Sequence, residues 1–469
     1  MKILLVTGEA LPFCKSGGLA DFIFSFGKAL VKEGQEVSVI LPFYKSIREK
    51  HPEILNGYYD TFDFNMNWRR QGCGVFTKMV EGVEYYFVAM DEWFDRPNLY
   101  GYDDDIGRFA AFMMAVNTFI TRHNHFDVVH CNDWQTAVLP LLLRYNPNPI
   151  KTVLTIHNPA YQGYARRNDL SYYFNLHTDF FDSGLVRMGD SFNFLKTGIM
   201  TADKVSTVSK THAQELIHDH DGFGGIGAII DYCKHNDFVG IVNGLDTEIW
   251  NPATDKHLYK NYSIKDYEEG KRANKLALLN NLGMSADFKG PLYSAITRLS
   301  SQKGVERIIQ CMPHLKKADA RLIVIGTGEM EDNFLYNALQ YPEVYFIKRY
   351  DENLAHVLYA ASDYFLMPSY FEPCGTSQLI SMRYGTVPIV SNVGGLNDTV
   401  KDLSVGDEAT GFVFNNKDYF GFINCFYASE DYFYSHGLKR EIENGMKGDY
   451  GWSNSAKEYI ALYNSITWK

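Results

Sequence analysis

Short apolar runs alternate with stretches of helical pattern along most of the chain. This alternation is typical of α/β proteins, in which a parallel sheet is built from strands joined by crossover helices. The expected strands are residues 2–6, 36–41, 127–131, 152–156, 204–208 and 240–242 in the first half, and residues 293–297, 321–325, 344–347, 364–367, 387–390 and 412–414 in the second. Each half is therefore predicted to form one doubly wound parallel sheet.

The length of the chain and one polar segment predict where it divides. A chain of 469 residues is expected to form two or three domains. The polar, insertion-like region 251–270 lies just past the midpoint and indicates a hinge near residues 240–250. We expect a Rossmann-like domain over residues 1–240 and a second one over residues 241–451. Residues 452–469 have apolar positions at helical spacing, so we expect a helix that completes the second domain or packs back on the first.

Two longer segments, residues 98–107 and 161–190, are expected to be loops and irregular segments inserted into the first domain. Loops of this length are often functional rather than passive connections. We therefore expect them to have a functional role.

Charge and cysteine content exclude several classes of protein. The formal net charge is −11, from 45 basic and 56 acidic residues, which argues against a general nucleic-acid or anionic-membrane binder. The seven cysteines are scattered and include no Cys-x-x-Cys, so neither a disulfide framework nor a zinc site is expected. The apolar start of the chain meets polar residues at Thr7, too early for a signal peptide or a membrane span. We expect a soluble, cytoplasmic protein.

Residues 368–375 (Pro-Ser-Tyr-Phe-Glu-Pro-Cys-Gly) join the strand 364–367 to a helix predicted over residues 376–382. In open α/β sheets, ligands bind at this end of the strands. Free N–H groups at the start of a helix favour a phosphate. Because Glu372 would repel a phosphate, we expect it to face a neutral or transiently cationic part of the same ligand, such as a sugar ring.

Arg298 and Lys303 follow the first expected strand of the second half. The arginine fork and the lysine ammonium lie five residues apart across a turn, so they can converge on one diphosphate. A solvated strand end is the alternative. Gly304, directly before a predicted helix over residues 305–311, favours the phosphate interpretation.

Lys15, Gly17 and Gly18 follow the first strand of the chain. Two glycines let backbone N–H groups approach a phosphate, and the lysine adds charge. The alternative is the glycine-rich first turn of any nucleotide-type fold. The segment is neither a Gly-x-Gly-x-x-Gly nor a Walker A sequence, so hydride transfer and ATP hydrolysis lose support.

Two first-half strands end in polar and aromatic residues, at 130–134 (His-Cys-Asn-Asp-Trp) and 155–158 (Thr-Ile-His-Asn). We expect these residues to hydrogen-bond sugar hydroxyls while Trp134 packs on a ring face. A purely structural histidine is the alternative. The histidines do not have the spacing of a metal site.

Together these segments resemble the bacterial glycogen synthase and plant starch synthase family of retaining glycosyltransferases, family GT5, over nearly the whole chain. The matching segments are residues 15–19, 130–134, 155–158, 194–199, 240–246 with Trp250, 298–304, 371–375 and 394–400. The resemblance implies the GT-B fold, with two Rossmann-like domains facing a deep cleft. It also implies a nucleotide-sugar donor, ADP-glucose, and transfer of glucose with retention to the non-reducing end of an α-1,4-glucan.

The resemblance also implies a role for each matching position. The donor would be bound by Lys15, Gly17, Gly18, Arg298, Lys303, Tyr350, Cys374, Gly375, Thr376 and Ser377; the sugar by Trp134, His157, Asn158, Asn243 and Glu372; and the acceptor by Glu9 and Asp21. The expected catalytic group comprises Glu372, Lys15, Arg298, Lys303, His157 and Asp133. No metal or prosthetic group is expected.

Other enzymes and a binding protein are the alternatives. Transferases of the wider fold family carry Glu-x₇-Glu, but the residue eight after Glu372 is Ile380. UDP-glucose can replace ADP-glucose as donor, because either base would stack on Tyr350. A catalytically inactive glucan-binding protein would have lost a charged group, whereas Lys15, Arg298, Lys303 and Glu372 are all present. No nucleic-acid or membrane partner is expected.

Overall fold

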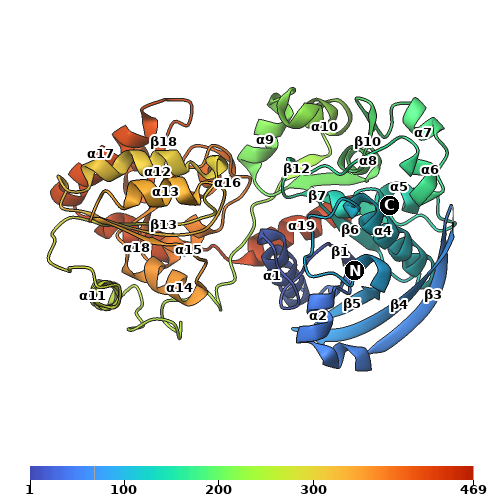
Figure 1. Ribbon diagram of the computed structural model, residues 1–469, viewed down its shortest axis with the longest axis horizontal. Helices are drawn as coiled ribbons and strands as arrows, with labels where there is room; N and C mark the ends of the chain where they lie inside the picture. Colours follow the sequence, from blue (N-terminus) through green and yellow to red (C-terminus); the bar gives the residue numbers. More distant parts are fainter. Residues whose placement is uncertain (68, 468–469) are drawn as a thin grey trace. The chain divides into compact units, whose positions relative to one another are not determined.

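The computed structural model describes residues 1–67 and 69–467. The chain forms two compact units (Figure 1). Unit 1 contains Met1–Gly244 together with the C-terminal segment that starts at Trp452, and unit 2 contains Leu245–Gly451. The C-terminal helix therefore belongs to unit 1. The change from unit 1 to unit 2 falls at residues 244–245, four residues beyond the expected boundary at 240–241.

The main sheet of unit 1 has the strand order β12-β11-β7-β6-β1-β2-β5-β4-β3. Its strands are β1 (Lys2–Val6), β2 (Glu36–Pro42), β3 (Tyr58–Met66), β4 (Arg69–Val80), β5 (Val83–Ala89), β6 (Val128–Asn132), β7 (Lys151–Ile156), β11 (Lys204–Thr207) and β12 (Phe238–Gly240). The strands from β12 to β5 are parallel to their neighbours, whereas β4 and β3 are antiparallel additions at one edge. A second, small sheet has the order β8 (Tyr164–Ala165), β10 (Ser191–Asn193), β9 (Arg187–Met188).

The helices of unit 1 flank this sheet or precede its strands (Figure 1). They are α1 (Gly18–Lys32), α2 (Lys45–Lys50), α3 (Asp91–Phe94), α4 (Asp105–Arg122), α5 (Leu139–Arg144), α6 (Asp169–Phe174), α7 (Asp179–Asp182), α8 (Phe194–Thr201), α9 (Lys210–His218), α10 (Ile226–Lys234) and α19 (Trp452–Thr467). Helix α19 packs on α1, with the rings of Tyr459 and Phe26 4.5 Å apart. Burial of these aromatic faces holds the end of the chain against unit 1.

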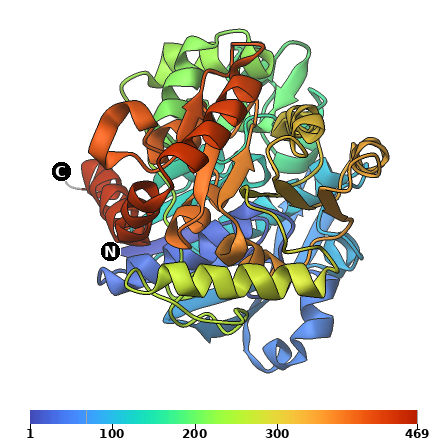
Figure 2. The same cartoon turned by 90° about the vertical axis from the view of Figure 1, so that its left-hand side faces the viewer.

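Unit 2 has one fully parallel sheet with the order β15-β14-β13-β16-β17-β18. Its strands are β13 (Leu292–Ile296), β14 (Arg321–Ile325), β15 (Val344–Ile347), β16 (Tyr364–Met367), β17 (Val387–Ser391) and β18 (Phe412–Phe414). Its helices are α11 (Tyr267–Asn281), α12 (Val305–Cys311), α13 (Glu331–Ala338), α14 (Glu352–Ala361), α15 (Ser377–Arg383), α16 (Gly394–Thr399), α17 (Gly421–Ser435) and α18 (Lys439–Lys447). Helix α11, the long yellow-green helix at the front of Figure 2, packs on α14.

The two sheets confirm the predicted doubly wound α/β class. All twelve expected strands occur, most of them within one residue of the expected bounds, and the expected strand 240–242 lies two residues earlier as β12. Two regions differ from the expectation. Strands β3, β4 and β5 were not expected, and region 161–190 contains the short helices α6 and α7 as well as strands β8 and β9. Within the described part of the chain, no helix combines the length and apolar character needed to cross a membrane.

The strand order fixes where ligands can bind in each unit. Counting along the chain, both parallel sheets begin with the order 3-2-1-4-5-6 of a Rossmann fold, and the winding reverses between the first and fourth strands. That switch point lies between β1 and β6 in unit 1, and between β13 and β16 in unit 2. Side chains that follow these four strands are therefore brought to a ligand-binding edge.

Candidate functional site

In unit 2, the segments after β13 and β16 bring a lysine and a carboxylate together. Lys303 Nζ lies 2.5 Å from Glu372 Oε2, and the Ser369 hydroxyl donates to the same oxygen at 3.1 Å. Glu372 is only 7% exposed. Two residues that are 69 positions apart thus form one charge-assisted hydrogen bond at the switch point.

Glycines let the backbone pack closely around Glu372. A side chain on Gly304, whose φ is +68°, would begin 2.0 Å from the carbonyl oxygen of Pro368. Side chains on Gly394 and Gly395 would begin 2.0 Å from the carbonyl oxygens of Glu372 and Cys374. Such contacts exclude any Cβ, so the segment carrying Glu372 is enclosed on both sides by backbone.

A buried glutamine adds a support that sequence reasoning missed. The side-chain amide of Gln378, on α15, donates to the carbonyl oxygens of Cys374 at 3.2 Å and Gly375 at 3.0 Å. Gln378 is fully buried and holds the residues directly after Glu372. A glutamine inside an apolar helix pattern is no signal by itself, because its role depends on which carbonyls the loop presents.

The remaining expected donor residues of unit 2 lie near the surface. Arg298 is exposed, and it forms no ion pair with any side chain that the structure describes. Tyr350 is 59% exposed, and Thr376 is also exposed. Ser377 is partly exposed, whereas the Cys374 side chain is buried. A guanidinium and an aromatic ring are thus accessible in the same unit as the Lys303–Glu372 pair.

In unit 1, Glu9 organises the glycine-rich segment after β1. Its carboxylate accepts hydrogen bonds from the backbone N–H groups of Ser16 (2.8 Å), Gly17 (3.1 Å) and Ala20 (3.2 Å), and from the Ser16 hydroxyl. Glu9 is 1% exposed, and burial raises the pKa of its carboxyl. The side chain caps the start of α1 from outside the helix. Its expected contact with the acceptor stays a prediction.

Lys15 and Asp21 form an ion pair of 2.9 Å, and their side chains are 44% and 45% exposed. The family resemblance assigned Lys15 to the donor and Asp21 to the acceptor, and both roles stay predictions.

Asp133, directly after β6, has an unusual backbone and an unusual environment. Its φ is +58°, outside the conformations that most residues adopt. Its Oδ1 accepts from the N–H groups of His157 at 2.7 Å and Asn158 at 3.3 Å. Burial nevertheless raises the pKa of the Asp133 carboxyl to about 7, and the nearby charge of Glu9 adds to the increase. A carboxyl that titrates near neutral pH is typical of functional sites.

His157 is a neutral histidine with a defined tautomer. Burial lowers its pKa to about 3. Its Nε2 lies 2.9 Å from Oδ1 of Asn132, whose amide nitrogen donates to the carbonyl oxygens of Val6 and His130. Because Asn132 must then present its oxygen, Nε2 carries the proton and Nδ1 can accept a hydrogen bond.

Trp134, Asn158 and Asn243 complete the expected sugar-binding set of unit 1. Trp134 packs against Phe109 at 5.3 Å and against Gly163, so much of its ring serves the core. Asn158 Oδ1 accepts from the N–H of Ala160. Oδ1 of Asn243 is buried without a hydrogen-bond partner among the described residues. Asn243 lies in unit 1, whereas the expected boundary assigned it to the second domain.

His130 has a structural role. Its ring nitrogens lie 2.6 Å from the Tyr463 hydroxyl of α19 and 2.6 Å from the Thr155 hydroxyl. The ring is fully buried, and burial lowers its pKa to about 3. His130 therefore supports the docking of α19. Among the described residues, no group of three or more His, Cys, Asp or Glu side chains is arranged to hold a metal ion.

Two family models match the chain. The starch synthase catalytic domain matches residues 2–231, and the model named glycosyl transferases group 1 matches residues 286–422. Two relatives that align over their full length are named glycogen synthase. A glycogen synthase of Lactobacillus acidophilus is 38% identical over 478 residues, which cover 99% of this chain and 100% of the relative. A glycogen synthase of Ligilactobacillus salivarius is 40% identical over 483 residues, with the same coverage.

Solved structures extend the comparison. The catalytic domain of starch synthase IV from Arabidopsis thaliana, solved with bound ADP and acarbose, superposes with a TM-score of 0.87 at 31% identity. It covers 100% of this chain, and 99% of that domain is covered. A sucrose-phosphate synthase from Thermosynechococcus elongatus shares the fold, with a TM-score of 0.61 at 16% identity over 99% of this chain and 98% of that one.

Proposed function

The chain belongs to the glycogen synthase and starch synthase family of glycosyltransferases, and on that premise we propose that it transfers glucose from ADP-glucose to the non-reducing end of an α-1,4-glucan. We propose that the anomeric configuration is retained. The names of the relatives support a glucan product, and the ADP and acarbose bound by the plant enzyme support the donor nucleotide and the acceptor class.

The Lys303–Glu372 pair is the observation that carries the proposal. When the bond between the anomeric carbon and the diphosphate breaks, positive charge develops on the sugar and negative charge on the leaving ADP. The Lys303 ammonium is complementary to the negative charge and the Glu372 carboxylate to the positive charge, and the two groups lie 2.5 Å apart at one switch point. On donor binding, we propose, Lys303 turns from Glu372 to the diphosphate while Glu372 faces the glucosyl ring.

The proposed step needs no protein nucleophile. The C1–O bond to the diphosphate breaks, the acceptor's 4-hydroxyl oxygen bonds to C1 on the same face, and its proton passes to a phosphate oxygen of the departing ADP. Arg298, Lys303 and Lys15 stabilise the leaving group by charge. Glu372 stabilises the positive charge on the ring. Two carboxylates flanking the bond, as in glycosidases, would leave these three basic side chains without a role.

Unit 1 contributes groups suited to uncharged hydroxyls. Neutral His157 can accept a hydrogen bond at Nδ1, and Asp133 with Asn158 lies beside it. We propose that these groups orient the glucosyl hydroxyls. Neutral partners avoid the desolvation cost that a charged group would incur beside an uncharged sugar.

We propose that the reaction uses no metal or prosthetic group, because basic side chains meet the leaving-group charge. Addition of EDTA to the assay should leave the initial rate unchanged. A rate that falls with EDTA and returns with Mg²⁺ would contradict this part of the proposal.

The function is tested by incubating the protein with glycogen and either ADP-glucose or UDP-glucose. We expect ADP release matched by incorporation of glucose into glycogen, with new α-linkages visible by NMR. Extension with UDP-glucose alone would replace the donor assignment. Glycogen binding without extension from either donor would indicate an inactive glucan-binding protein.

A further inference from the structure

In the segment 368–375, which carries Glu372, every backbone carbonyl oxygen accepts a hydrogen bond from within unit 2. The donors, taken in the order of the carbonyls, are the side chains of Arg307, Ser391, Asn416 and Gln302, then the N–H of Gly395 for two carbonyls, and then the side chain of Gln378 for two more. A carbonyl that moved away from its donor would lose its bond. These donors therefore hold the backbone that places Glu372.

Arg307, in the first turn of α12, is the charged donor of this group. It is 8% exposed. Its guanidinium donates to the Pro368 carbonyl at 3.0 Å, to the Asn416 side-chain oxygen at 2.8 Å and to the Asn416 carbonyl at 3.1 Å. The guanidinium carbon also lies 3.8 Å from the centre of the Tyr370 ring. All of these partners are neutral, so the positive charge is buried among dipoles and an aromatic face.

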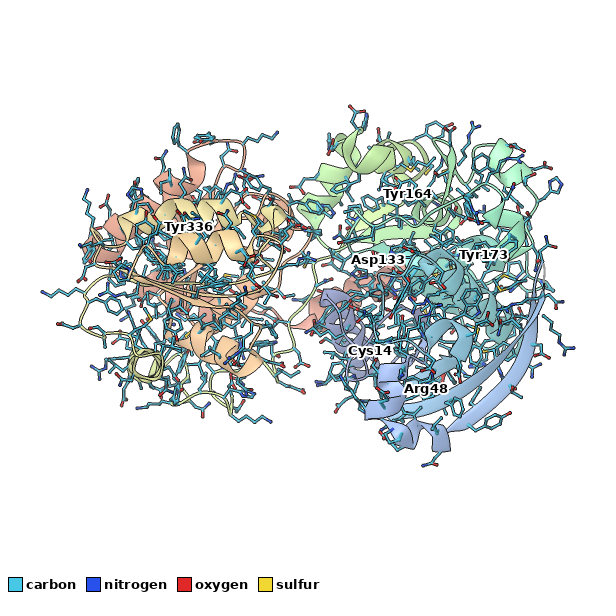
Figure 3. The ribbon with its side chains drawn as sticks, viewed as in Figure 1. Cys14, Arg48, Asp133, Tyr164, Tyr173 and Tyr336 are labelled. Atoms are coloured by element: carbon cyan, nitrogen blue, oxygen red, sulfur yellow. The ribbon has the colours of Figure 1, made fainter. Side chains whose placement is uncertain are left out.

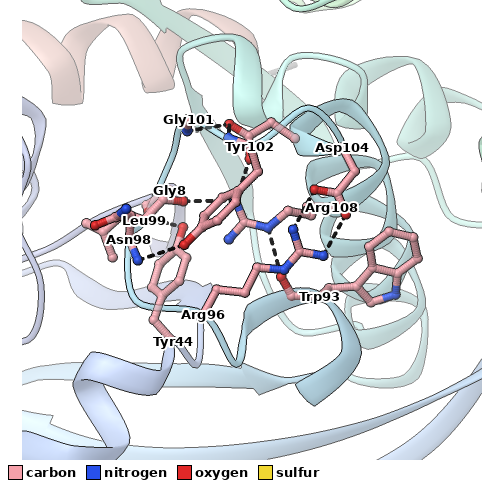
Figure 4. Close-up of polar contacts among 11 residues, drawn as sticks. Gly8, Tyr44, Trp93, Arg96, Asn98, Leu99, Gly101, Tyr102, Asp104 and Arg108 are labelled. Atoms are coloured by element: carbon pink, nitrogen blue, oxygen red, sulfur yellow. Dashed lines mark hydrogen bonds and ion pairs between the residues drawn. The ribbon is translucent and has the colours of Figure 1, made fainter.

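Arg108, in unit 1, is a buried arginine with an opposite charge beside it. It donates to the carbonyl oxygens of Trp93 at 2.8 Å and Leu99 at 3.1 Å, and it forms an ion pair with Asp105 (Figure 4). Arg307, by contrast, forms no ion pair with any side chain in residues 1–67 and 69–467. Burying a charge without an opposite charge costs free energy. An apolar side chain would therefore fill this space at lower cost, and the bonds of Arg307 need another explanation.

Asn416, between β18 and α17, extends the bonds of Arg307 to a second carbonyl. Its side-chain oxygen accepts from Arg307, and its amide nitrogen donates to the Tyr370 carbonyl at 3.1 Å. Because the amide accepts with one atom and donates with the other, its orientation is fixed. The two side chains thus hold the backbone on both sides of Ser369, whose hydroxyl donates to Glu372.

The segment that carries Lys303 contributes two of these donors. Gln302 donates to the Phe371 carbonyl at 3.1 Å, and Arg307 follows four residues after Lys303. In the proposed reaction, Lys303 turns from Glu372 to the diphosphate, so the ion pair is lost just when the position of the carboxylate matters. The side chains of Gln302 and Arg307 can then keep the two segments together.

We propose that Arg307, acting with Asn416, is a positioning residue that keeps Glu372 in place after Lys303 has turned to the donor. This inference rests on the proposed function, since it takes the movement of Lys303 from that reaction. In this role Arg307 acts through the backbone of residues 368–372 and contacts neither substrate. Its loss should therefore slow the chemical step without weakening donor binding.

Arg307→Met tests this role, because it keeps the length of the side chain and removes the charge and the hydrogen bonds. We expect kcat to fall roughly tenfold while the KM for ADP-glucose stays within about twofold of wild type, since a small misplacement affects the chemical step. Arg307→Lys keeps the charge and can keep one bond, so it should recover part of the loss.

Arg321→Met is the matched control. The Arg321 guanidinium lies 4.7 Å from the centre of the Phe288 ring and donates to the Ala320 carbonyl at 2.9 Å. Arg321 begins β14, so it lies at the amino ends of the strands, opposite to the ligand-binding edge. The variant loses the same kinds of contact as Arg307→Met, and its kcat should equal that of wild type.

Variants of the two neighbours of Arg307 sharpen the kinetic test. Asn416→Ala should lower kcat about as much as Arg307→Met, and the double variant should lose little more, because the two side chains act as one unit. Tyr370→Ala removes the ring beside the guanidinium and should have a smaller effect. Its control is Tyr336→Ala, which removes a tyrosine that is 71% exposed on α13 (Figure 3) and should leave kcat unchanged.

Hydrogen exchange separates this proposal from the proposed function, because it needs no turnover. The Tyr370 N–H donates to the Gln302 carbonyl at 2.9 Å, so its exchange rate reports whether the segment is held. Lys303→Ala reproduces the loss of the ion pair. We expect this N–H to stay protected in Lys303→Ala, and to exchange roughly tenfold faster when Arg307→Met is added.

Three results would overturn the proposal. They are a wild-type kcat in folded Arg307→Met, an equal loss of kcat in Arg307→Met and Arg321→Met, and a raised KM for ADP-glucose at unchanged kcat, which would make Arg307 a donor-binding residue. If Arg307→Met does not fold, Asn416→Ala takes its place in every comparison. If the wild-type protein transfers no glucose, exchange decides: faster exchange in the double variant supports the proposal, and equal exchange rejects it.

Discussion

Six parallel strands have the same order in the two units, yet the switch points carry different chemistry. In unit 2 an ammonium and a carboxylate form an ion pair, and the Arg298 side chain is exposed in the same unit. In unit 1 desolvation lowers the pKa of His157, which follows the neighbouring strand β7, to about 3 and raises that of Asp133 to about 7, so the histidine is neutral and the carboxyl is partly protonated near pH 7. The same fold thus delivers polar residues to the same edge, but their partners differ: Glu372 lies beside an ammonium, whereas Asp133 accepts from two backbone N–H groups.

This difference suggests how the proposed reaction is divided. The charged edge of unit 2 suits a diphosphate and the cation-like ring attached to it. The neutral edge of unit 1 suits hydroxyl groups. Lys15 is the exception in unit 1, because it is half-exposed and paired with Asp21 rather than buried.

Replacing Glu372 with alanine should have the largest effect. We expect kcat to fall by about 10²–10³-fold, as for loss of one preorganised charge-stabilising group. Initial rates of ADP release with glycogen as acceptor provide the measurement. Thermal unfolding of the same variant serves as the folding control, and near-normal turnover in a folded variant would remove Glu372 from the mechanism.

Replacing Arg298 with alanine should lower kcat/KM for ADP-glucose by about 10²-fold, because a charged contact to the diphosphate is lost. The residue is exposed, so folding should be unaffected. Arg298→Lys keeps the charge but loses the planar fork, so its kcat/KM for ADP-glucose should lie between those of Arg298→Ala and the wild-type enzyme. If Arg298→Ala and the wild-type enzyme had the same kcat/KM, the donor assignment of unit 2 would be wrong.

Asp133→Asn tests the neutral character of unit 1. The folded-state pKa of about 7 lies above the ordinary value, so the folded protein binds a proton that the unfolded chain has lost. The stabilising proton is fully bound below about pH 4 and is lost as the pH rises through 7. Relative to wild type, the variant should therefore gain at least about 1 kcal/mol between pH 5 and pH 8, because one pKa unit corresponds to 1.36 kcal/mol.

Denaturant unfolding at the two pH values measures this difference. A constant gap between variant and wild type from pH 5 to pH 8 would show that Asp133 titrates normally. The contrast between charged and neutral edges would then lose its strongest evidence.

Tyr463→Phe should have the smallest effect, confined to stability. It removes the 2.6 Å hydrogen bond between the Tyr463 hydroxyl and His130, and should cost about 1 kcal/mol of unfolding free energy. Because neither Tyr463 nor His130 is assigned to the donor, the ADP affinity should not change. A loss of ADP affinity in this variant would give α19 a role beyond docking on unit 1.

The buried parallel strands could be predicted from the sequence because they are continuous apolar runs. Residues 321–325 and 364–367 were predicted with the bounds that β14 and β16 have. Strand β3 was missed because Phe62, Phe64 and Met66 alternate with exposed residues, the pattern of a strand with one solvated face. A short apolar run is a clear signal, whereas a two-residue alternation over part of a segment is easily overlooked.

The composition of the candidate site was easier to predict than its contacts. The order of the motifs along the chain predicted that Lys303 and Glu372 lie at one sheet edge. Their ion pair, however, depends on how closely the backbones pack at Gly304 and Gly394. The bond between His130 and Tyr463 spans 333 positions and has no local signal. The functional roles assigned to individual residues stay predictions until the variants are measured.

Titration of ADP by calorimetry tests the central claim, that the charged edge of unit 2 binds the donor nucleotide and the neutral edge of unit 1 does not. We expect Arg298→Ala to weaken ADP binding by roughly tenfold or more, since a hydrogen bond to a charged group is worth about 1.5–3 kcal/mol. We also expect Asp133→Asn to bind ADP with the wild-type Kd. Equal Kd values for Arg298→Ala and wild type, or equal weakening in both variants, would contradict it.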